Sequence, residues 1–188
     1  MDGFFSKIDF LIRRRKQIRL ERKLDAACDG RTVLMFHKIY AVGDDDSCDG
    51  YSEYSISKDK FLSMLDDAKR RGYLFVSPSE LFKNDGKKKV LLTFDDVFDG
   101  VYNYLYPELK RRNIPFCIFP AIDLIDKEGY LSEKMIREML EDSECVLGSH
   151  SISHCILRSL SDSEEEISES KTILQKKFSC TVDSISLW

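Results

Sequence analysis

Short apolar runs alternate with helical patterns through most of this chain, and this alternation constrains the fold more than any other feature. The run from Lys89 to Phe94 has a nearly continuous apolar character, which is expected of a strand whose two faces are both covered. Repeated strand–helix units of this length predict an α/β fold, with a parallel sheet or barrel and helices on its outside. The expected strands are 33–36, 73–76, 89–94, 115–120, 144–147 and 182–187, and the expected helices are 57–71, 79–82, 99–112, 132–140 and 161–177.

Length and composition fit one globular domain. The chain has 188 residues, of which 43% are hydrophobic, and this is enough for a substantial core and too many for a disordered chain. We divide it into an N-terminal amphipathic basic helix, residues 1–31, and a domain spanning residues 32–188. Residues 40–55 of the domain are rich in Asp, Gly and Ser and predict a loop.

Two groups of side chains that could bind a metal stand at the ends of expected strands. Asp95 and Asp96 directly follow one expected strand, and His150 and His154 follow another. Because the carboxyl ends of parallel strands form the sites of α/β folds, we expect these side chains to meet. A carboxylate plus two imidazoles is a common ligand set for a divalent metal.

The two aspartates can take different roles, because adjacent residues in a loop point in different directions. Asp96 would be the third ligand beside the two histidines, whose spacing of four residues would bring both imidazoles to the same side of a helical turn. Three protein ligands leave a position open for water, whose pKa a catalytic zinc lowers to about 7. Asp95 could take the proton as this water attacks, which implies hydrolysis of an amide or ester carbonyl.

A plainer interpretation stays open for each of these pieces. An Asp-Asp pair after a strand is often only a turn or helix-cap element, and two histidines in a polar segment are often only surface residues. The placement of both pieces at the same ends of strands is what favours a site.

The charge of the chain is unevenly distributed. The net charge is −4, which gives no reason to expect nucleic-acid binding, but residues 1–25 carry +4 and the remainder carries −8. Residues 3–27 predict one helix with a partial apolar stripe beside a basic run. Such a helix could lie on an anionic membrane surface through residues 1–27, or it could pack on its own domain or on a partner.

The N-terminus and the cysteines predict a cytoplasmic protein, with peripheral contact at the membrane as an alternative. The apolar stretch from Ile8 to Ile12 is interrupted by Asp9, and the basic run follows it, which is not the order of a secretion signal. No stretch approaches the roughly 20 apolar residues needed to cross a bilayer. Six cysteines are scattered without a CxxC pair, which favours reduced thiols.

Two motifs give this chain a strong resemblance to a known family. The sequence Thr93-Phe94-Asp95-Asp96 resembles the TFDD motif of polysaccharide deacetylases with a NodB homology domain, which form carbohydrate esterase family 4. The sequence from His150 to His154 resembles the H-[ST]-x-x-H motif of the same family, and the similarity extends over about 32–188. The resemblance implies a distorted, incomplete TIM-like (β/α) barrel.

The resemblance also implies an activity and roles for residues. The activity is that of a metal-dependent hydrolase that removes N- or O-acetyl groups from an acetylated sugar precursor, glycan or polysaccharide, and for an N-acetyl group the bond is a non-peptide carbon–nitrogen bond. Asp95 corresponds to the general base. Asp96, His150 and His154 correspond to the ligands of a divalent metal, with zinc expected first and cobalt or iron as alternatives. His37 matches an early strand-end histidine, whose role as a structural, pocket-lining or catalytic residue stays open.

The chain departs from the family pattern at two places. Val97 stands where the family usually has Gly after TFDD, and a valine is strained if this position needs a positive φ, so either the backbone differs or Asp96 is held less well. The sequence ends at Trp188, where a third motif should begin, and no histidine follows His154 to act as the general acid. We therefore expect a C-terminally truncated domain with reduced activity.

Two other functions compete with that of an active deacetylase. An inactive deacetylase remnant could act as a metal- or glycan-binding module, or as a partner subunit that receives its missing strands from elsewhere. A membrane-surface adaptor carried by the basic N-terminal helix is the third interpretation.

Overall fold

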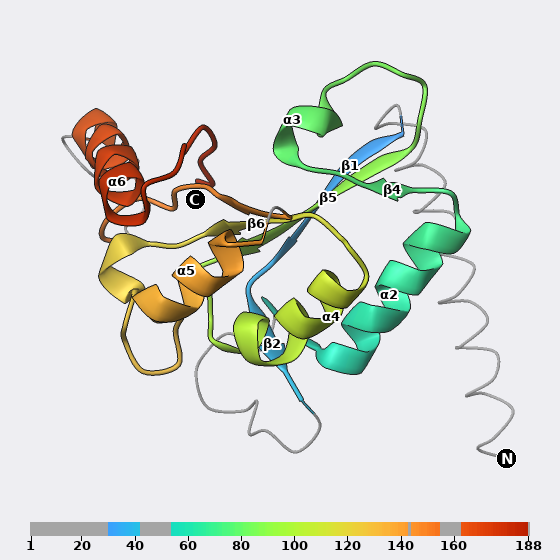
Figure 1. The fold of residues 1–188 in the computed structure, drawn as a ribbon, viewed down its shortest axis with the longest axis horizontal. Helices are drawn as coiled ribbons and strands as arrows, with labels where there is room; N and C mark the ends of the chain where they lie inside the picture. Colours follow the sequence, from blue (N-terminus) through green and yellow to red (C-terminus); the bar gives the residue numbers. More distant parts are fainter. Residues whose placement is uncertain (1–29, 42–53, 143, 155–162, 188) are drawn as a thin grey trace, which may run out of the picture.

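A parallel sheet forms the centre of the molecule (Figure 1). The computed structural model describes residues 30–41, 54–142, 144–154 and 163–187. The strands of the main sheet are β1 (Arg31–Phe36), β4 (Leu74–Phe75), β5 (Lys89–Asp95), β6 (Phe116–Phe119) and β7 (Cys145–Leu147), and a separate parallel pair consists of β2 (Lys38–Tyr40) and β3 (Ser55–Ser57). β5 pairs with β1 along one edge and with β4 and then β6 along the other, and β6 pairs with β7. The expected α/β class with a parallel sheet is therefore confirmed.

Helices follow the strands, and capping residues set several of their starts. The helices are α2 (Lys58–Arg70), α3 (Pro78–Leu81), α4 (Tyr106–Arg111), α5 (Glu133–Leu140) and α6 (Ser163–Phe178), with a π-helical turn η2 (Val101–Leu105) and a 3₁₀ turn η3 (Ile122–Leu124). Ser57 and Ser132 are N-caps, because each side chain accepts a hydrogen bond from the backbone N–H three residues later. Pro107 lies in the first turn of α4, where no N–H is needed, and the expected helix 99–112 is divided there into η2 and α4.

The sheet buries its two faces unequally. On one face, a large core cluster joins side chains of β5, β6 and β7 to side chains of α2, α4, α5 and α6, and Figure 1 shows α2, α4 and α5 along this side. A smaller cluster covers the other face, and it consists of Leu81, Leu91, Cys117 and Phe119. On that face Val33 and Met35 of β1 are 50% and 55% exposed. The described residues thus form an open parallel sheet, which is consistent with an incomplete barrel.

Two parts of the fold differ from the expectation. The strand expected over 182–187 is wrong, because these residues form only one parallel bridge, between Ile185 and Ser149. Polar residues interrupt the apolar pattern there, so that no continuous strand face is available. β2 and β3 were not expected, because a strand of three residues gives too short a pattern to recognise.

The basic helix expected over 3–27 lies outside the described residues, so its membrane contact stays a prediction. Three cysteines also lie outside them: Cys28, Cys48 and Cys155. The three described cysteines are free thiols, as expected: Cys117, Cys145 and Cys180. In the part of the chain that the structure describes, no helix combines the length and the apolar character needed to cross a bilayer.

Gly148, just before the site, leaves room for the ring of Phe119, and its replacement should destabilise the fold. A Cβ at this position would lie 2.2 Å from the ring of Phe119 and 2.9 Å from the hydroxyl of Ser184. We expect Gly148→Ala to lower the free energy of unfolding by about 1–3 kcal/mol, because a buried ring must move to make room. Urea denaturation measures the change, with Lys134→Ala on the exposed face of α5 as a control expected within about 0.5 kcal/mol of wild type. Equal stability of both variants would contradict this close packing.

Candidate active site

A tight turn at the end of β5 presents the two aspartates. Asp95 is the last residue of β5, and the Val97 N–H donates to the Asp95 carbonyl at 2.5 Å, which closes a three-residue turn around Asp96. The φ angles of Asp96 and Val97 are +58° and +61°. Aspartate tolerates this left-handed region, whereas a β-branched residue is strained in it. The turn therefore gives Asp95 and Asp96 different partners, although they are neighbours in the chain.

Val97 adopts the left-handed backbone despite its branched side chain. Its side chain is 1% exposed within the main core, and its carbonyl accepts a hydrogen bond from Leu131 N at 3.0 Å. The surrounding core holds a residue in such a strained conformation. The strain expected for a valine at a positive φ is therefore present. Asp96 stays buried, at 1% exposure.

A bent, non-helical segment brings His150 and His154 together, and the helical turn expected from their spacing is wrong. The His150 N–H donates to the Pro120 carbonyl at 3.1 Å. The carbonyls of Ser151 and Ile152 accept hydrogen bonds from N–H groups of η3, so the segment runs beside η3 and does not coil on itself. Positive φ angles at Ser151 (+68°) and His154 (+58°) turn the chain, and the two imidazole centroids lie 5.2 Å apart.

The structure brings Asp96, His150 and His154 to one point, as the motifs predicted. Asp96 Oδ1 lies 2.7 Å from His154 Nε2 and 3.2 Å from His150 Nε2. One ligand atom from each residue lies within 4.8 Å of the others. His150 is 3% exposed, whereas the side chain of His154 is 18% exposed. Solvent therefore reaches these three residues from the side of His154.

The hydrogen bonding of these three residues fits a bound cation. Neither carboxylate oxygen of Asp96 has a hydrogen-bond partner within the described part of the chain, although both ring nitrogens lie close to Oδ1. His150 Nδ1 lies 2.9 Å from the Ser186 carbonyl, which can only accept, so Nδ1 carries a proton. Nε2 of the neutral ring then presents a lone pair to the Asp96 carboxylate. Such an arrangement is unfavourable in a buried site unless a proton or a metal cation lies between the two groups.

The pKa values of Asp95 and His150 are both raised, for different reasons. Asp95 is 2% exposed, and burial raises the pKa of its carboxyl, although the hydrogen bond from Ser186 opposes this. The Ser186 hydroxyl donates to Asp95 Oδ2 at 2.7 Å, and Oδ1 has no partner among the described residues. Burial lowers the pKa of His150, but the Asp96 carboxylate and the Ser186 carbonyl outweigh it, and the pKa is raised. The site therefore attracts positive charge to the imidazole and protons to Asp95.

His37 lines the same site. It directly follows β1, is 3% exposed and interacts electrostatically with Asp95 and Asp96. Burial lowers the pKa of His37, and the two carboxylates oppose the shift without cancelling it. Its ring centroid lies 5.1 Å from that of Tyr54. These contacts favour the pocket-lining role among those that the sequence left open.

Two residues that the motifs did not identify, Glu166 and Ser186, also contact the site. Glu166 of α6 accepts hydrogen bonds through Oε1 from Ile152 N at 3.1 Å, Ser153 N at 2.7 Å and Ser153 Oγ at 2.6 Å. It therefore holds the segment between the two histidines. An acid near the start of a helix is ordinarily attributed to the helix dipole, so the sequence signal for Glu166 was misleading, and Ser186 carried no signal.

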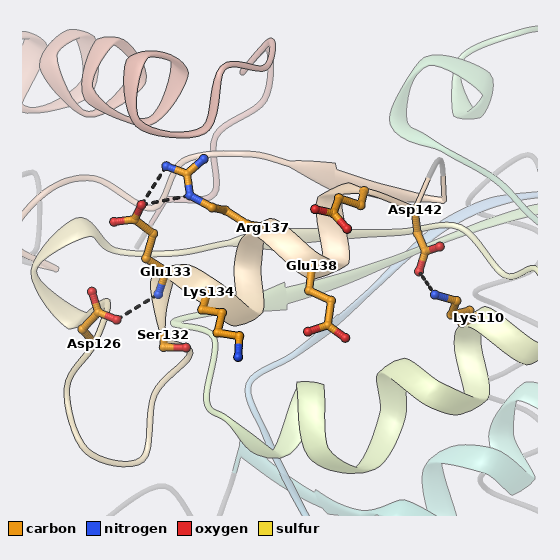
Figure 2. A pocket seen from close by; sticks show the side chains of 9 residues that line it. Lys110, Asp126, Ser132, Glu133, Lys134, Arg137, Glu138 and Asp142 are labelled. Atoms are coloured by element: carbon orange, nitrogen blue, oxygen red, sulfur yellow. Dashed lines mark hydrogen bonds and ion pairs between the residues drawn. The ribbon is translucent and has the colours of Figure 1, made fainter.

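A broad surface groove lies apart from these residues, over α5 and the end of α4 (Figure 2). Its volume is about 1020 Å³, and charged side chains form most of its lining. Arg137 pairs with Glu133 at 2.7 Å, and Lys110 pairs with Asp142 at 3.1 Å. Since the lining includes none of the predicted site residues, we assign the chemistry to the aspartate–histidine site.

The sequence profile of the family described as "Polysaccharide deacetylase" matches residues 82–186, which include both motifs. In Bacillus subtilis (strain 168), the protein named "Putative polysaccharide deacetylase YxkH" is 26% identical over 154 residues. The alignment covers 78% of this chain and 52% of YxkH, so the chain spans about half the length of this curated relative.

Solved structures share the fold. The structure of Streptococcus pyogenes deacetylase PplD in complex with acetate has a TM-score of 0.71 and 26% identity, over 82% of this chain and 72% of PplD. A polysaccharide deacetylase from Bacillus cereus has a TM-score of 0.70 and 26% identity, over 82% of this chain and 50% of its own.

Proposed function

This chain belongs to the polysaccharide deacetylase family, and we propose that it is a metal-dependent hydrolase that removes acetyl groups from an acetylated sugar or polysaccharide. The observation that carries the proposal is the convergence of Asp96, His150 and His154, with Asp95 directly beside them. The names of the relatives support an acetylated carbohydrate as the substrate, because the Bacillus cereus protein is called a polysaccharide deacetylase and the PplD structure contains acetate.

Asp96, His150 and His154 would hold the ion through one carboxylate oxygen and two Nε2 atoms. This ligand set suits zinc, with cobalt or iron as alternatives. When bound, the ion supplies Lewis acidity, which lowers the pKa of water and polarises a carbonyl oxygen. The Ser186 carbonyl holds His150 in the tautomer that leaves Nε2 available as a ligand.

Asp95 is placed to hold the proton during the reaction. Its Oδ2 accepts from Ser186, which leaves Oδ1 available. Oδ1 would take a proton from water as the water oxygen attacks the acetyl carbon. The same proton would then pass to the leaving nitrogen or oxygen of the sugar, so that the products are acetate and a free amine or hydroxyl.

An acetate-release assay on the full purified chain tests this function. The chain is loaded with Zn²⁺ or Co²⁺ and offered N-acetylated chito-oligosaccharides and, separately, an O-acetylated polysaccharide. We expect acetate from at least one substrate, loss of release with a chelator, and recovery when the metal is returned. One equivalent of bound metal with no acetate from either substrate would favour the metal- or glycan-binding module. Folded protein without bound metal would contradict the metal dependence.

The hydrogen bonds that Glu166 accepts from the segment between the two histidines should increase the affinity for metal. We expect Glu166→Ala to weaken Zn²⁺ binding by about 10- to 100-fold, because three hydrogen bonds to Ile152 and Ser153 are lost and His154 is less well placed. Competition with a chromophoric chelator measures the affinity. Glu165→Ala removes an exposed carboxylate one residue away on α6 and should bind Zn²⁺ as wild type does. Equal affinity of all three proteins would mean that α6 does not position the ligands.

A further inference from the structure

Ser186 contacts the site through its hydroxyl and its carbonyl, and we propose that it is a positioning residue for both the proton-accepting carboxylate and one imidazole ligand. Its hydroxyl donates to Asp95 Oδ2 at 2.7 Å, and its carbonyl accepts from His150 Nδ1 at 2.9 Å. Its N–H donates to the Ser149 carbonyl at 2.9 Å. The catalytic part of this proposal rests on the proposed function, whereas the part that concerns His150 does not.

The backbone fixes Ser186 beside the ends of the strands. Ser149 follows β7, and its N–H donates to the Ser184 carbonyl at 3.0 Å while its carbonyl accepts from Ser186. These two hydrogen bonds make the parallel bridge between Ser149 and Ile185. Ser186 is therefore attached to the residue that directly precedes His150, and its own position depends on the sheet.

The hydroxyl of Ser186 decides how the Asp95 carboxylate is turned. A carboxylate has two equivalent oxygens, and the terminal torsion of aspartate is broad, so a directional partner is needed to select one orientation. The hydroxyl occupies Oδ2, and Oδ1 is left without a partner among the described residues. A serine hydroxyl is neutral, so it orients the carboxylate without neutralising it by a fixed positive charge.

The carbonyl of Ser186 decides which nitrogen of His150 is available. A carbonyl can only accept, so the Nδ1 atom of His150 must donate to it. In the neutral ring this places the lone pair on Nε2, which lies 3.2 Å from Asp96 Oδ1. A hydrogen bond on the far nitrogen fixes the tautomer and the ring orientation of a metal-binding histidine.

Three variants test the role of the hydroxyl. Ser186→Ala should lower kcat by about 10- to 100-fold with KM within about threefold of wild type, because a misdirected base slows the reaction without weakening substrate binding. Ser186→Thr keeps a hydroxyl and should recover most of the loss. Ser184→Ala is the matched control, because it removes a hydroxyl two residues away that lies 3.9 Å from Cys117 Sγ.

Comparison of Ser186→Ala with Ser184→Ala separates the role of the Ser186 hydroxyl from a general effect of mutating this segment. A wild-type kcat in Ser186→Ala would overturn the proposal that the hydroxyl orients Asp95. An equal loss of kcat in Ser184→Ala would overturn it too. Zn²⁺ affinity of Ser186→Ala should stay within about threefold of wild type, because the carbonyl remains. A larger loss of Zn²⁺ affinity would place the effect of the hydroxyl on the metal ligands instead.

The role of the carbonyl is tested by the ring ¹⁵N signals of His150, measured by NMR on the full chain with and without Zn²⁺. We expect a proton on Nδ1 in both states, and an Nδ1 without a proton in either state would overturn this part of the proposal. The measurement does not depend on turnover. A wild-type chain that shows the Nδ1 proton and binds Zn²⁺ but releases no acetate would contradict the proposed function while leaving the positioning of His150 intact.

Discussion

Asp96→Ala is expected to weaken Zn²⁺ binding by roughly a hundredfold or more and to abolish acetate release. Loss of an outer partner of a metal ligand already costs about 10- to 100-fold in affinity, and removal of a ligand itself should cost at least as much. Asp96 is the carboxylate in this ligand set, and its Oδ1 lies within 3.2 Å of both imidazole Nε2 atoms. Titration against a chromophoric chelator gives the affinity, and the acetate assay gives the activity.

The same variant should lose little stability when no metal is present. Asp96 buries a carboxylate with no hydrogen-bond partner in the described ranges, which is unfavourable for the folded state. Replacing it with alanine removes this cost, but it also removes the interaction with the two imidazoles and places alanine at a φ of +58°. Because these effects oppose one another, urea denaturation of the metal-free proteins should show a loss of no more than about 2 kcal/mol. The combination of lost binding with retained stability would assign the defect to the site itself.

Asp123→Ala provides the control for this experiment. Asp123 is an exposed carboxylate of η3, close to the histidine segment in the fold but outside the three candidate ligands. It should bind Zn²⁺ within about threefold of wild type. Wild-type affinity in Asp96→Ala, or an equal loss in Asp123→Ala, would contradict the assignment of Asp96 as a ligand.

The meeting of the two motifs could be predicted because it depends on strand ends. A nearly continuous apolar run precedes Asp95, and β5 is buried along its whole length. β5 and β7 are parallel and separated by β6 alone, so their carboxyl ends lie near each other at one edge. An apolar run that predicts a strand buried on both faces therefore also predicts where the side chains at the end of that strand lie.

The local path of the chain through the site could not be predicted in this way. A spacing of four residues suggests a helical turn for His150 and His154, but the segment is bent and non-helical, with hydrogen bonds from η3 to its carbonyls. Positive φ angles at Ser151 and His154 have no signal in residue type, because neither residue is glycine. These features depend on neighbours that are brought close only by the fold.

The sequence did not identify Ser186 and Glu166 as partners of the site residues, for a related reason. The hydrogen bond from Ser186 to Asp95 spans 91 residues of sequence, and the bonds from Ile152 and Ser153 to Glu166 span 14 and 13. A serine near a short polar stretch and a glutamate near the start of a helix both have ordinary local interpretations. Motifs identify the groups that perform chemistry, whereas the groups that orient them are recognised from tertiary contacts.

Asp95→Asn is expected to lower kcat by about 10²- to 10⁴-fold while Zn²⁺ affinity stays within about threefold of wild type. Asparagine has nearly the shape of aspartate, and its amide oxygen can still accept from the Ser186 hydroxyl. It cannot take a proton from water, so the variant removes proton transfer and leaves the candidate ligands in place. Acetate release at saturating substrate gives kcat, and retention of more than about a tenth of the wild-type kcat would contradict the role of Asp95 as the base.

The stability of Asp95→Asn supplies an independent check on the same carboxylate. Burial raises the pKa of Asp95 in the folded protein, so its ionised form is less favourable there than in the unfolded chain. The resulting cost is absent below the unfolded pKa and grows as the pH rises towards the folded pKa. In metal-free protein at neutral pH, Asp95→Asn should therefore be at least as stable as wild type. A variant that is stable and binds Zn²⁺ but does not release acetate would mean that Asp95 is retained for its chemistry, since the fold is no weaker without its charge.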